Sequence, residues 1–483
     1  MKRMNRAILS VFILHVLAAC HTGPGPTPEN ERPPDVLVVV LDTVRADMLS
    51  TYGYDRPTSP QLDAVAEAGV VFEDVTVAGS WTWPGHASLF TGMGPWANGA
   101  HASMAEPGTG LAQGQWGLTP IHADIPTLAE RFADAGYRTV SLAANRFLDP
   151  SLGLTRGFQT AETMKDHALV KRARALMAEP SDKPLFLFVN LLVAHAPWEV
   201  YPAPWSDPYR SVLSTAKTAP SWTKGYLMSD PIALNLYQIR DGHKMGGFQQ
   251  LQNGGLSIPD ADMPMVMDLY AAGLLAVDFL LNGVLSQWTA TRPSGIVAVT
   301  SDHGEYLGEH GLWEHGKTVY TEVTNVPLVI AAPGRLPAGK RVGTPVQMHD
   351  LHDTVLDLAN ITPNTPGSLL PIIDGAPRPG PILAKAWTSR PWKEALGGVF
   401  AEDWWLYREG NDALIESSGG TRQYFNLGTD PQMTRDLAAS FPEKVRDLSA
   451  KAATAFAERD APSETVPMSA DVIEELRALG YVD

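Results

Sequence analysis

Polar side chains that suit a metal-assisted reaction follow three apolar runs of the chain. Asp42 comes directly after the β-branched run 35–41, Asp302 and His303 follow a second run, and His195 follows a third. Polar residues just after buried strands lie at the usual ligand-binding edge of open α/β sheets. Two carboxylates and an imidazole that converge there can hold one divalent cation. The ligand types suit calcium, magnesium, manganese or zinc, so the sequence predicts a metal site without choosing the ion.

The elements that must position these side chains indicate an α/β fold. Continuous β-branched runs are typical of strands buried on both faces, and runs with helical spacing lie between them. Strands that alternate with helices favour a large, mostly parallel sheet sandwiched by helices. The predicted strands are 35–41, 70–72, 137–143, 185–192, 295–300 and 326–332, and the predicted helices are 60–68, 126–135 and 269–285.

The body of the chain divides into a catalytic domain, an insertion and a smaller C-terminal part. We expect the catalytic domain at 35–375, and within it residues 198–264 lose the alternating pattern, which is typical of an insertion or lid. The aromatic side chains of that insertion either cover a substrate, for example by stacking on a sugar ring, or pack the insertion onto the sheet. Residues 376–483 predict a small α+β subdomain, with strands at 404–407 and 423–427 and helices at 441–458 and 469–479.

The order of the chemical motifs along the chain resembles a known family. Asp42 is followed by the string Thr-Trp-Pro-Gly-His-Ala-Ser-Leu-Phe-Thr-Gly that begins at Thr82, then by His195-Ala-Pro, and then by Asp302-His303-Gly-Glu. In this order the chain is similar, over nearly its whole length, to the sulfatase branch of the alkaline phosphatase superfamily. The resemblance implies an alkaline-phosphatase-like fold and a metal-dependent enzyme that acts on sulfate or phosphate esters.

The resemblance also assigns a metal-binding role to four residues. Asp42, Asp302 and His303 match the metal ligands of the family. Thr82 stands at the position of the nucleophile, with its oxygen on the metal. A divalent ion in such a site lowers the pKa of the nucleophile and stabilises charge on a sulfuryl or phosphoryl centre. One divalent metal ion is therefore the expected cofactor.

Three further residues match the part of the family site that surrounds the ester. His195 matches the histidine that contacts the ester. His315 and Lys317 lie where family members place groups that neutralise the substrate oxygens or protonate the leaving group. The alternative for Lys317 is a solvated side chain with no part in the reaction.

The nucleophile motif departs from that of ordinary sulfatases. Those enzymes carry Cys or Ser in a Cys/Ser-x-Pro-x-Arg motif, and that residue is oxidised to formylglycine. Here Thr82 and His86 hold the first and last positions of the motif, and we include both among the candidate catalytic residues. Formylglycine expels sulfate when its geminal diol collapses to the aldehyde, whereas a threonine ester has no second oxygen. Release therefore requires attack by water or an acceptor hydroxyl at the sulfur or phosphorus itself.

Two more departures bear on the reaction. Asp42 is followed by Thr43 where the family has a second aspartate, and Ala-Ala-Asn-Arg at 143–146 replaces a Gly-Lys-Trp-His segment. Such a site resembles the phosphoglycerol and phosphoethanolamine transferases on the outer face of bacterial membranes. We therefore expect a hydrolase or transferase of a sulfate or phosphate ester, with phosphoester chemistry slightly favoured. The alternatives are a transferase of that type and a catalytically silent binding lipoprotein. The expected substrate is a small-molecule, glycan or lipid ester.

The first residues of the chain predict an export address. A positively charged start and the apolar stretch 7–17 end in Leu-Ala-Ala-Cys20, which resembles the lipobox of bacterial lipoproteins. Residues 1–19 are therefore expected to be a lipoprotein signal peptide, Cys20 the lipidated residue, and the Pro- and Gly-rich segment 20–34 a tether. The alternative is an ordinary secretory signal that contains a Cys by chance.

Composition agrees with an exported, lipid-anchored enzyme. The chain has 483 residues, 53 acidic against 37 basic side chains, a net charge of −16 and one Cys, at position 20. The lack of a basic block argues against a nucleic-acid partner, and a single Cys excludes internal disulfides and Cys-cluster zinc sites. No further apolar run is expected to be long enough to span a membrane. We therefore expect a catalytic body held at the periplasmic or outer-membrane face of a bacterial membrane.

Overall fold

The computed structural model places most of the expected catalytic body. It describes residues 32–104, 116–196, 238–240, 243–245, 251–252, 258, 260–363, 367–387, 398–456, 466, 468 and 471–473. The signal peptide, Cys20 and nearly all of the tether lie outside the described residues, as do most of the 198–264 insertion and most of the predicted 469–479 helix. Residues 34–483 form one compact unit, and its described part is the subject of the following paragraphs.

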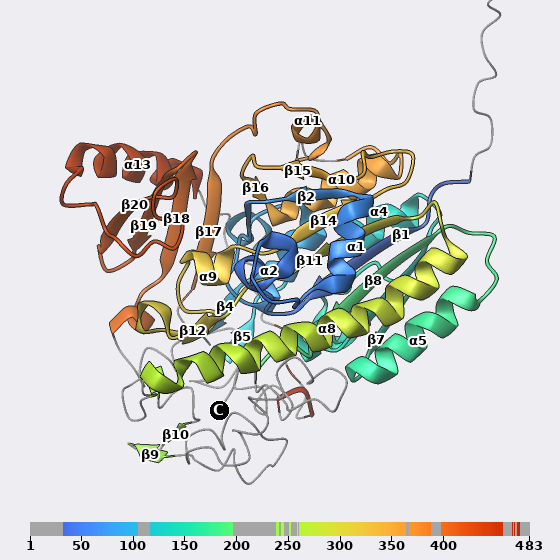
Figure 1. The fold of residues 1–483 in the computed structure, drawn as a ribbon, viewed down its shortest axis with the longest axis horizontal. Helices are drawn as coiled ribbons and strands as arrows, with labels where there is room; N and C mark the ends of the chain where they lie inside the picture. Colours follow the sequence, from blue (N-terminus) through green and yellow to red (C-terminus); the bar gives the residue numbers. More distant parts are fainter. Residues whose placement is uncertain are drawn as a thin grey trace, which may run out of the picture. The chain divides into compact units, whose positions relative to one another are not determined.

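An eight-stranded mixed sheet forms the centre of this unit (Figure 1). Strand β1 lies in the middle and runs parallel to its two neighbours, β11 and β8. Strand β14 is antiparallel to both of its neighbours, β11 and β2. The order is β15 (Lys340–Val342), β2 (Val70–Phe72), β14 (Leu328–Ala331), β11 (Ile296–Thr300), β1 (Val36–Leu41), β8 (Leu185–Leu191), β6 (Arg138–Ala143) and β7 (Thr160–Thr163). The predicted large, mostly parallel sheet is therefore confirmed.

The central strands β1, β8 and β11 are almost entirely apolar because both faces of the sheet are covered by helices (Figure 1). Alternate residues of β1 face opposite sides, so that Val38 joins one hydrophobic cluster and Val39 the other. The first cluster contains side chains of α2 (Thr82–Thr91), α4 (Leu128–Asp134) and α10 (Leu351–Leu358), and the second contains those of α1 (Pro60–Ala68), α5 (Asp166–Ala178) and α8 (Met263–Thr291).

Helix α8 is longer than the sequence predicted and is buried in one of these layers. Its segment Val266–Thr291 is long and apolar enough to cross a membrane by length and composition alone, so the expectation of no such run is wrong. However, 67% of the most apolar window is buried, and α8 packs against α5 and α1 over the sheet. In this structure α8 is therefore a core helix of the α/β unit.

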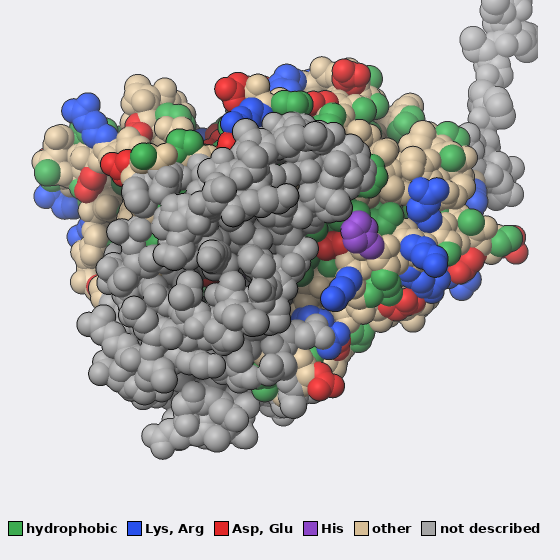
Figure 2. Space-filling model, turned by 60° about the horizontal axis from the view of Figure 1, so that its bottom comes forward, with side chains coloured by type: hydrophobic (Ala, Val, Ile, Leu, Met, Phe, Trp, Pro, Cys, Tyr) green, Lys and Arg blue, Asp and Glu red, His purple; other side chains and the backbone are tan. Residues whose placement is uncertain are grey.

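The outer surface of α5 carries charges of both signs. Figure 2 shows Lys and Arg side chains interspersed with acidic ones over the described surface on this side. Arg172 pairs with Glu162 at 2.9 Å, and Arg138 pairs with Glu179 at 2.7 Å. These ion pairs lie on the surface, where each contributes little to stability.

A second, antiparallel sheet forms the C-terminal subdomain and is attached directly to the main unit. One of its faces is covered by a helix and the other packs against residues 306–323 of the catalytic unit. The Lys385 amide donates to the Ala78 carbonyl at 2.9 Å, four residues before α2. The sequence predicted two of the four strands and the helix. The elements are β17 (Ile382–Ala386), β18 (Trp404–Glu409), β19 (Asp412–Ser417), β20 (Arg422–Asn426) and α13 (Pro442–Ala455).

Shorter elements connect these layers. They are β3 (Val75–Thr76), α3 (Pro95–Asn98), β4 (Ala102–Met104), β5 (Trp116–Leu118), β9 (Gln238–Arg240), β10 (His243–Met245), β12 (Tyr306–Leu307), β13 (Trp313–Glu314), α9 (Thr321–Thr324), β16 (Val346–Gln347) and α11 (Leu370–Ile373).

Candidate active site

Three of the predicted metal ligands meet at the C-terminal edge of the main sheet. Asp42 directly follows β1, and Asp302 and His303 follow its neighbour β11. All three side chains are buried, and one ligand atom from each lies within 4.8 Å of the others. Parallel strands end at the same edge of a sheet, which is why residues 260 positions apart in sequence come together here.

The predicted nucleophile reaches this group from the first residue of α2. Thr82 Oγ1 lies 3.5 Å from His303 Nε2. The helix can come this close because Gly85 faces the backbone of Asp302, where an added Cβ would lie 2.6 Å from the Asp302 carbonyl oxygen. A glycine one turn into α2 therefore sets the distance between the nucleophile and the metal ligands.

Two asparagines orient the Asp42 carboxylate. Asn145, which follows β6, donates from Nδ2 to Asp42 Oδ2 at 2.9 Å, and Asn190, on β8, donates to the same oxygen at 3.0 Å. The other oxygen, Asp42 Oδ1, has no hydrogen-bond partner among the described residues. Buried carboxylate oxygens normally have partners, so Oδ1 is the atom left for a metal ion.

The His303 side chain is also prepared for a cation. Its Nδ1 lies 2.9 Å from the carbonyl oxygen of Gly304, which can only accept, so Nδ1 carries the proton and Nε2 presents a lone pair. Burial lowers the pKa of His303 to about 4, which keeps the ring neutral, as a metal ligand must be.

The Asp302 carboxylate is buried close to the carboxylate of Asp42. Its Oδ1 accepts from the backbone amides of Thr43 and His303, while Oδ2 accepts no hydrogen bond among the described residues. Burial, and then the nearby Asp42 carboxylate, raise the pKa of Asp302 well above its ordinary value. Two such oxygens and an imidazole lone pair fit a divalent cation, which would favour the charged form of both carboxylates.

Thr43, at the position where the family has a second aspartate, contributes its backbone. Its φ of 60° is in the left-handed region, which is rare for a β-branched residue. The Thr43 carbonyl accepts from Tyr270 at 2.6 Å, and its amide lies 3.3 Å from Asp302 Oδ1. A strained conformation of this kind costs on the order of 1–3 kcal/mol and persists where surrounding contacts impose it.

Two of the three residues predicted around the ester lie beside this group. The ring of His315 lies 4.3 Å from that of His303 and 5.1 Å from that of His195. His315 Nδ1 is 2.9 Å from Glu305 Oε1. Burial, and then the neighbouring histidines, hold the pKa of His315 well below its ordinary value. These imidazoles therefore form one cluster that can accept or deliver a proton next to the nucleophile.

Lys317 is buried and held by neighbouring groups. Its ammonium donates to the carbonyl of Trp313 and lies 3.0 Å from Glu314 Oε2. The alternative of a solvated lysine is therefore wrong, because the side chain is only 4% exposed. Part of its charge is balanced by Glu314.

His86 lies in the interior beneath the metal ligands. Its Nδ1 donates to the Thr82 carbonyl at 2.9 Å and lies 3.3 Å from Asp302 Oδ2. Its ring packs against Phe90 and Phe188. This geometry suits a residue that positions Asp302 and α2, and differs from that of an arginine that reaches the substrate.

Comparison with known proteins matches the sulfatase family model to residues 34–361. The chain belongs to the sulfatase family. It is 22% identical over 471 residues to the Δ4,5-hexuronate-2-O-sulfatase of Bacteroides thetaiotaomicron, an alignment that covers 87% of this chain and 89% of that protein.

Solved structures of low sequence identity share the fold. A protein in complex with its substrate D-glucosamine-2-N,6-O-disulfate superposes with a TM-score of 0.66 at 16% identity, covering 90% of this chain and 100% of the other. The phosphonate monoester hydrolase of Agrobacterium radiobacter gives 0.64 at 19% identity, covering 87% and 95%. The predicted alkaline-phosphatase-like fold is thereby confirmed.

Family membership confirms the predicted class of enzyme. The relatives are sulfatases, which are ester-hydrolysing enzymes, and sulfatases are metal-dependent. In this member of the sulfatase family the group Asp42, Asp302 and His303 provides a site that could hold a metal ion.

Two amides of this site are functional residues that sequence reasoning missed. Asn145 lies in the segment 143–146 that departs from the family, and Asn190 lies inside a predicted strand. Asn145 also donates to Thr82 Oγ1 at 3.2 Å. The signal that could have found both residues is their position, because each stands at the end of a parallel strand on the same edge as Asp42.

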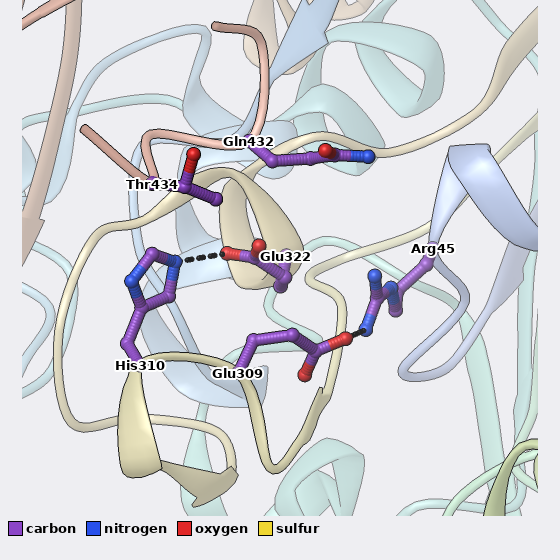
Figure 3. Close-up of a pocket in the computed structure, with 6 residues that line it drawn as sticks. All are labelled: Arg45, Glu309, His310, Glu322, Gln432 and Thr434. Carbon is purple, nitrogen blue, oxygen red and sulfur yellow. Dashed lines mark hydrogen bonds and ion pairs between the residues drawn. The ribbon is translucent and has the colours of Figure 1, made fainter. Parts of the chain in front are cut away.

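A separate polar pocket of about 440 Å³ is lined by side chains that follow β1, β12 and β20 and by one side chain of α9 (Figure 3). Arg45 Nη1 donates to Glu309 at 2.6 Å and to the Glu305 carbonyl at 3.1 Å. His310 lies 3.2 Å from Glu322. Arg45 therefore connects this pocket to Glu305, whose side chain lies 2.9 Å from His315 Nδ1. Its lining residues are Arg45, Glu309, His310, Glu322, Gln432 and Thr434.

Proposed function

We propose that this chain cleaves a sulfate- or phosphate-type ester through a covalent ester on Thr82. The observation that carries the proposal is the position of Thr82 Oγ1, which accepts from Asn145 and lies 3.5 Å from His303 Nε2 at the edge where the ligand residues meet. A hydroxyl at this point has a donor on one side and the metal-ligand group on the other, as an activated nucleophile requires.

Asp42, Asp302 and His303 would hold one divalent metal ion. Asp42 Oδ1 and Asp302 Oδ2, which accept no hydrogen bond within the described part of the chain, and the imidazole lone pair support this assignment. Calcium, magnesium, manganese and zinc all accept such ligands. When bound, the ion supplies positive charge that lowers the pKa of a hydroxyl and stabilises a developing anion.

The protein's own residues would carry the reaction in two displacements. In the first, Thr82 Oγ1 gives its proton to the cluster of His195 and His315 and bonds to the sulfur or phosphorus. The bond to the leaving alcohol breaks, and that alcohol takes the proton from the same cluster. In the second, water attacks the same atom, the bond to Thr82 breaks, and Oγ1 regains a proton. Lys317 would balance charge on the ester oxygens.

The absence of a second oxygen on threonine favours a phosphoester or phosphonate over a sulfate ester. The sulfatase relatives favour the opposite choice, so both substrate classes belong in the test. The purified chain is assayed with nitrophenyl sulfate, phosphate, phosphodiester and phosphonate esters and each of the four metal ions. Glycerol and ethanolamine, added as acceptor hydroxyls, distinguish transfer from hydrolysis.

Thr82→Ala is the decisive variant and Thr82→Ser its matched control. We expect Thr82→Ala to lose at least about 10³-fold in kcat, because it has no nucleophile, while Thr82→Ser retains part of the activity. Full activity in Thr82→Ala would overturn the proposal. A chain that neither turns over any ester nor takes up a divalent ion would support the catalytically silent alternative.

We also propose that the chain is exported and held at a bacterial membrane by lipid on Cys20. The proposal is supported by the positively charged start, the apolar stretch and the Leu-Ala-Ala-Cys string of the sequence. Acyl chains on Cys20 would place the full-length protein in the membrane fraction. Cys20→Ser should move the protein to the soluble fraction if its signal peptide is removed. A variant that has lost residues 1–19 and still stays in the membrane fraction would contradict lipid anchoring.

A further inference from the structure

The Asn145 side chain contacts both halves of the reacting centre. Its Nδ2 lies 2.9 Å from Asp42 Oδ2 and 3.2 Å from Thr82 Oγ1. An amide nitrogen carries two hydrogens, so one Asn145 side chain can donate to a metal ligand and to the nucleophile at the same time.

The orientation of this amide is fixed by the surrounding backbone. Asn145 Oδ1 accepts from the Phe147 amide at 3.0 Å, as the N-cap of a short 3-10 helix. The Asn145 amide donates to Asn190 Oδ1 at 3.1 Å. Since Oδ1 is held by a donor, the flipped amide, with its oxygen toward Asp42, would place two acceptors together. The buried Asn145 is therefore a preorganised donor.

The hydrogen bond to Thr82 has a chemical consequence. Asn145 can only donate from Nδ2, so Thr82 Oγ1 accepts from it both as a hydroxyl and as an alkoxide. A bond to an ionised acceptor is roughly twice as strong as a neutral one. The interaction is therefore stronger when negative charge lies on Oγ1, which is the condition for lowering a reaction barrier.

We propose that Asn145 is a catalytic residue that stabilises negative charge on Thr82 Oγ1 as the covalent ester forms and breaks. This inference rests on the proposed function. In the second displacement a water oxygen bonds to the sulfur or phosphorus, the Oγ1 bond breaks with its electron pair on Oγ1, and the proton lost by water returns to Oγ1. Threonine must itself be the leaving group here, so the donor acts in both steps.

Asn190 supplies the matched control. It donates to the same Asp42 oxygen as Asn145, at 3.0 Å against 2.9 Å, and among the described residues it makes no hydrogen bond to Thr82. Asn145→Ala and Asn190→Ala each remove one donor from Asp42, and only Asn145→Ala removes the donor to the nucleophile. A role confined to Asp42 would affect the two variants alike.

The experiment compares wild type with both variants by three measurements. Calorimetric titration gives the affinity for the divalent ion, steady-state kinetics at saturating ion give kcat and KM, and intact-mass spectrometry after rapid quenching gives the amount of Thr82 ester. We expect both variants to weaken ion binding to a similar extent. At saturating ion, kcat of Asn145→Ala should fall about 100-fold with little change in KM, and the rates of ester formation and breakdown should both fall.

At saturating ion Asn190→Ala should lose markedly less kcat than Asn145→Ala, because it removes only the donor to Asp42. Asn145→Asp should fail to restore activity, because an ionised carboxylate cannot donate. Equal kcat values in Asn145→Ala and Asn190→Ala at saturating ion, in the presence of an active wild type, would overturn the role of Asn145 alone. A wild type that turns over none of the esters would overturn the proposed function and this role with it.

Discussion

The two sides of the candidate site are built in different ways. The side that holds Asp42, Asp302 and the two asparagines stands on strand ends of the central sheet, and its carboxylate and amide groups are fixed by hydrogen bonds to neighbouring strands. The side that holds His195 and His315 comes from loops that follow β8 and β13.

We infer from this difference that the strand-end side determines the type of reaction and that the loop side determines the choice of substrate. Strand ends hold side chains with little freedom, which suits metal ligands and a nucleophile. Loops tolerate change and usually carry recognition. Substitutions on the strand-end side should therefore abolish the chemistry, and those on the loop side should change its dependence on the ester.

The largest effect is expected on the strand-end side, from Asp302→Asn. Loss of a charged ligand should reduce kcat by more than about 10³-fold and remove high-affinity metal binding, measured by metal analysis of the purified protein. A chelator should lower the melting temperature of wild type and leave that of Asp302→Asn unchanged. Asp357→Asn on α10 is the control acid. If Asp302→Asn kept its metal and its activity, the strand-end side would not determine the chemistry as we infer.

On the loop side, His315→Ala should lower kcat less than Asp302→Asn does, and the size of this decrease should depend on the leaving group. We expect a loss of about 100-fold in kcat with an alkyl ester, whose alcohol needs a proton, and a much smaller loss with a nitrophenyl ester. Steady-state kinetics on the two esters measure the ratio, and Lys317→Gln shows the effect of charge alone. Equal losses on both esters would remove proton transfer from the role of His315.

The contact between α2 and the metal ligands can be tested by Gly85→Ala. The new Cβ would meet the Asp302 carbonyl oxygen at 2.6 Å, so the free energy of unfolding should fall by about 1–3 kcal/mol and metal affinity should weaken. Gly283→Ala on α8 is the control, because its Cβ would meet a side chain of Val170 instead of backbone. Denaturant unfolding and metal titration give both quantities. Wild-type metal affinity in Gly85→Ala would show that α2 adjusts without moving Asp302.

The smallest effect on activity is expected from a substitution in the helix layer that packs on one face of the sheet. Asp278 on α8 accepts from the Gln61 and Leu62 amides at the start of α1, and burial raises its pKa to about 7. The folded state therefore binds this proton more tightly than the unfolded chain does. Its contribution to stability is present below about pH 4 and is lost as the pH rises through 7.

Asp278→Asn should remove this pH dependence, which is on the order of 3 kcal/mol between pH 4 and 7, and should leave kcat within about twofold of wild type. Urea unfolding at several pH values measures the slope. A slope identical to that of wild type would show that Asp278 does not titrate in this range.

The sequence predicted best what depends on strands buried on both faces. The runs around β1, β8 and β11 are almost entirely apolar, and the polar residue after each such run is then expected at one edge of the sheet. Asp42, Asp302 and His303 were located in this way, and the structure brings them together. Their roles as ligands remain predictions.

Features that depend on contacts between distant segments were not accessible from sequence. Asn145 has the pattern of an ordinary cap after a strand, and only the packing of β6 beside β8 brings it to Thr82. The inward direction of His86 is set by Phe188 and Asp302, far along the chain. Strands β17 and β19 contain no aromatic residue, whereas the predicted strands β18 and β20 do, so the local preference for a strand was weaker in the two that were missed.

The hydrogen bond from Lys385 to Ala78 limits how this protein can be rebuilt. The edge strand of the C-terminal sheet is joined to the chain four residues before the helix on which Thr82 stands. An engineer who exchanged that sheet for one from a relative would change the backbone that leads into the nucleophile. The C-terminal sheet is therefore part of the catalytic framework and cannot be treated as an interchangeable module.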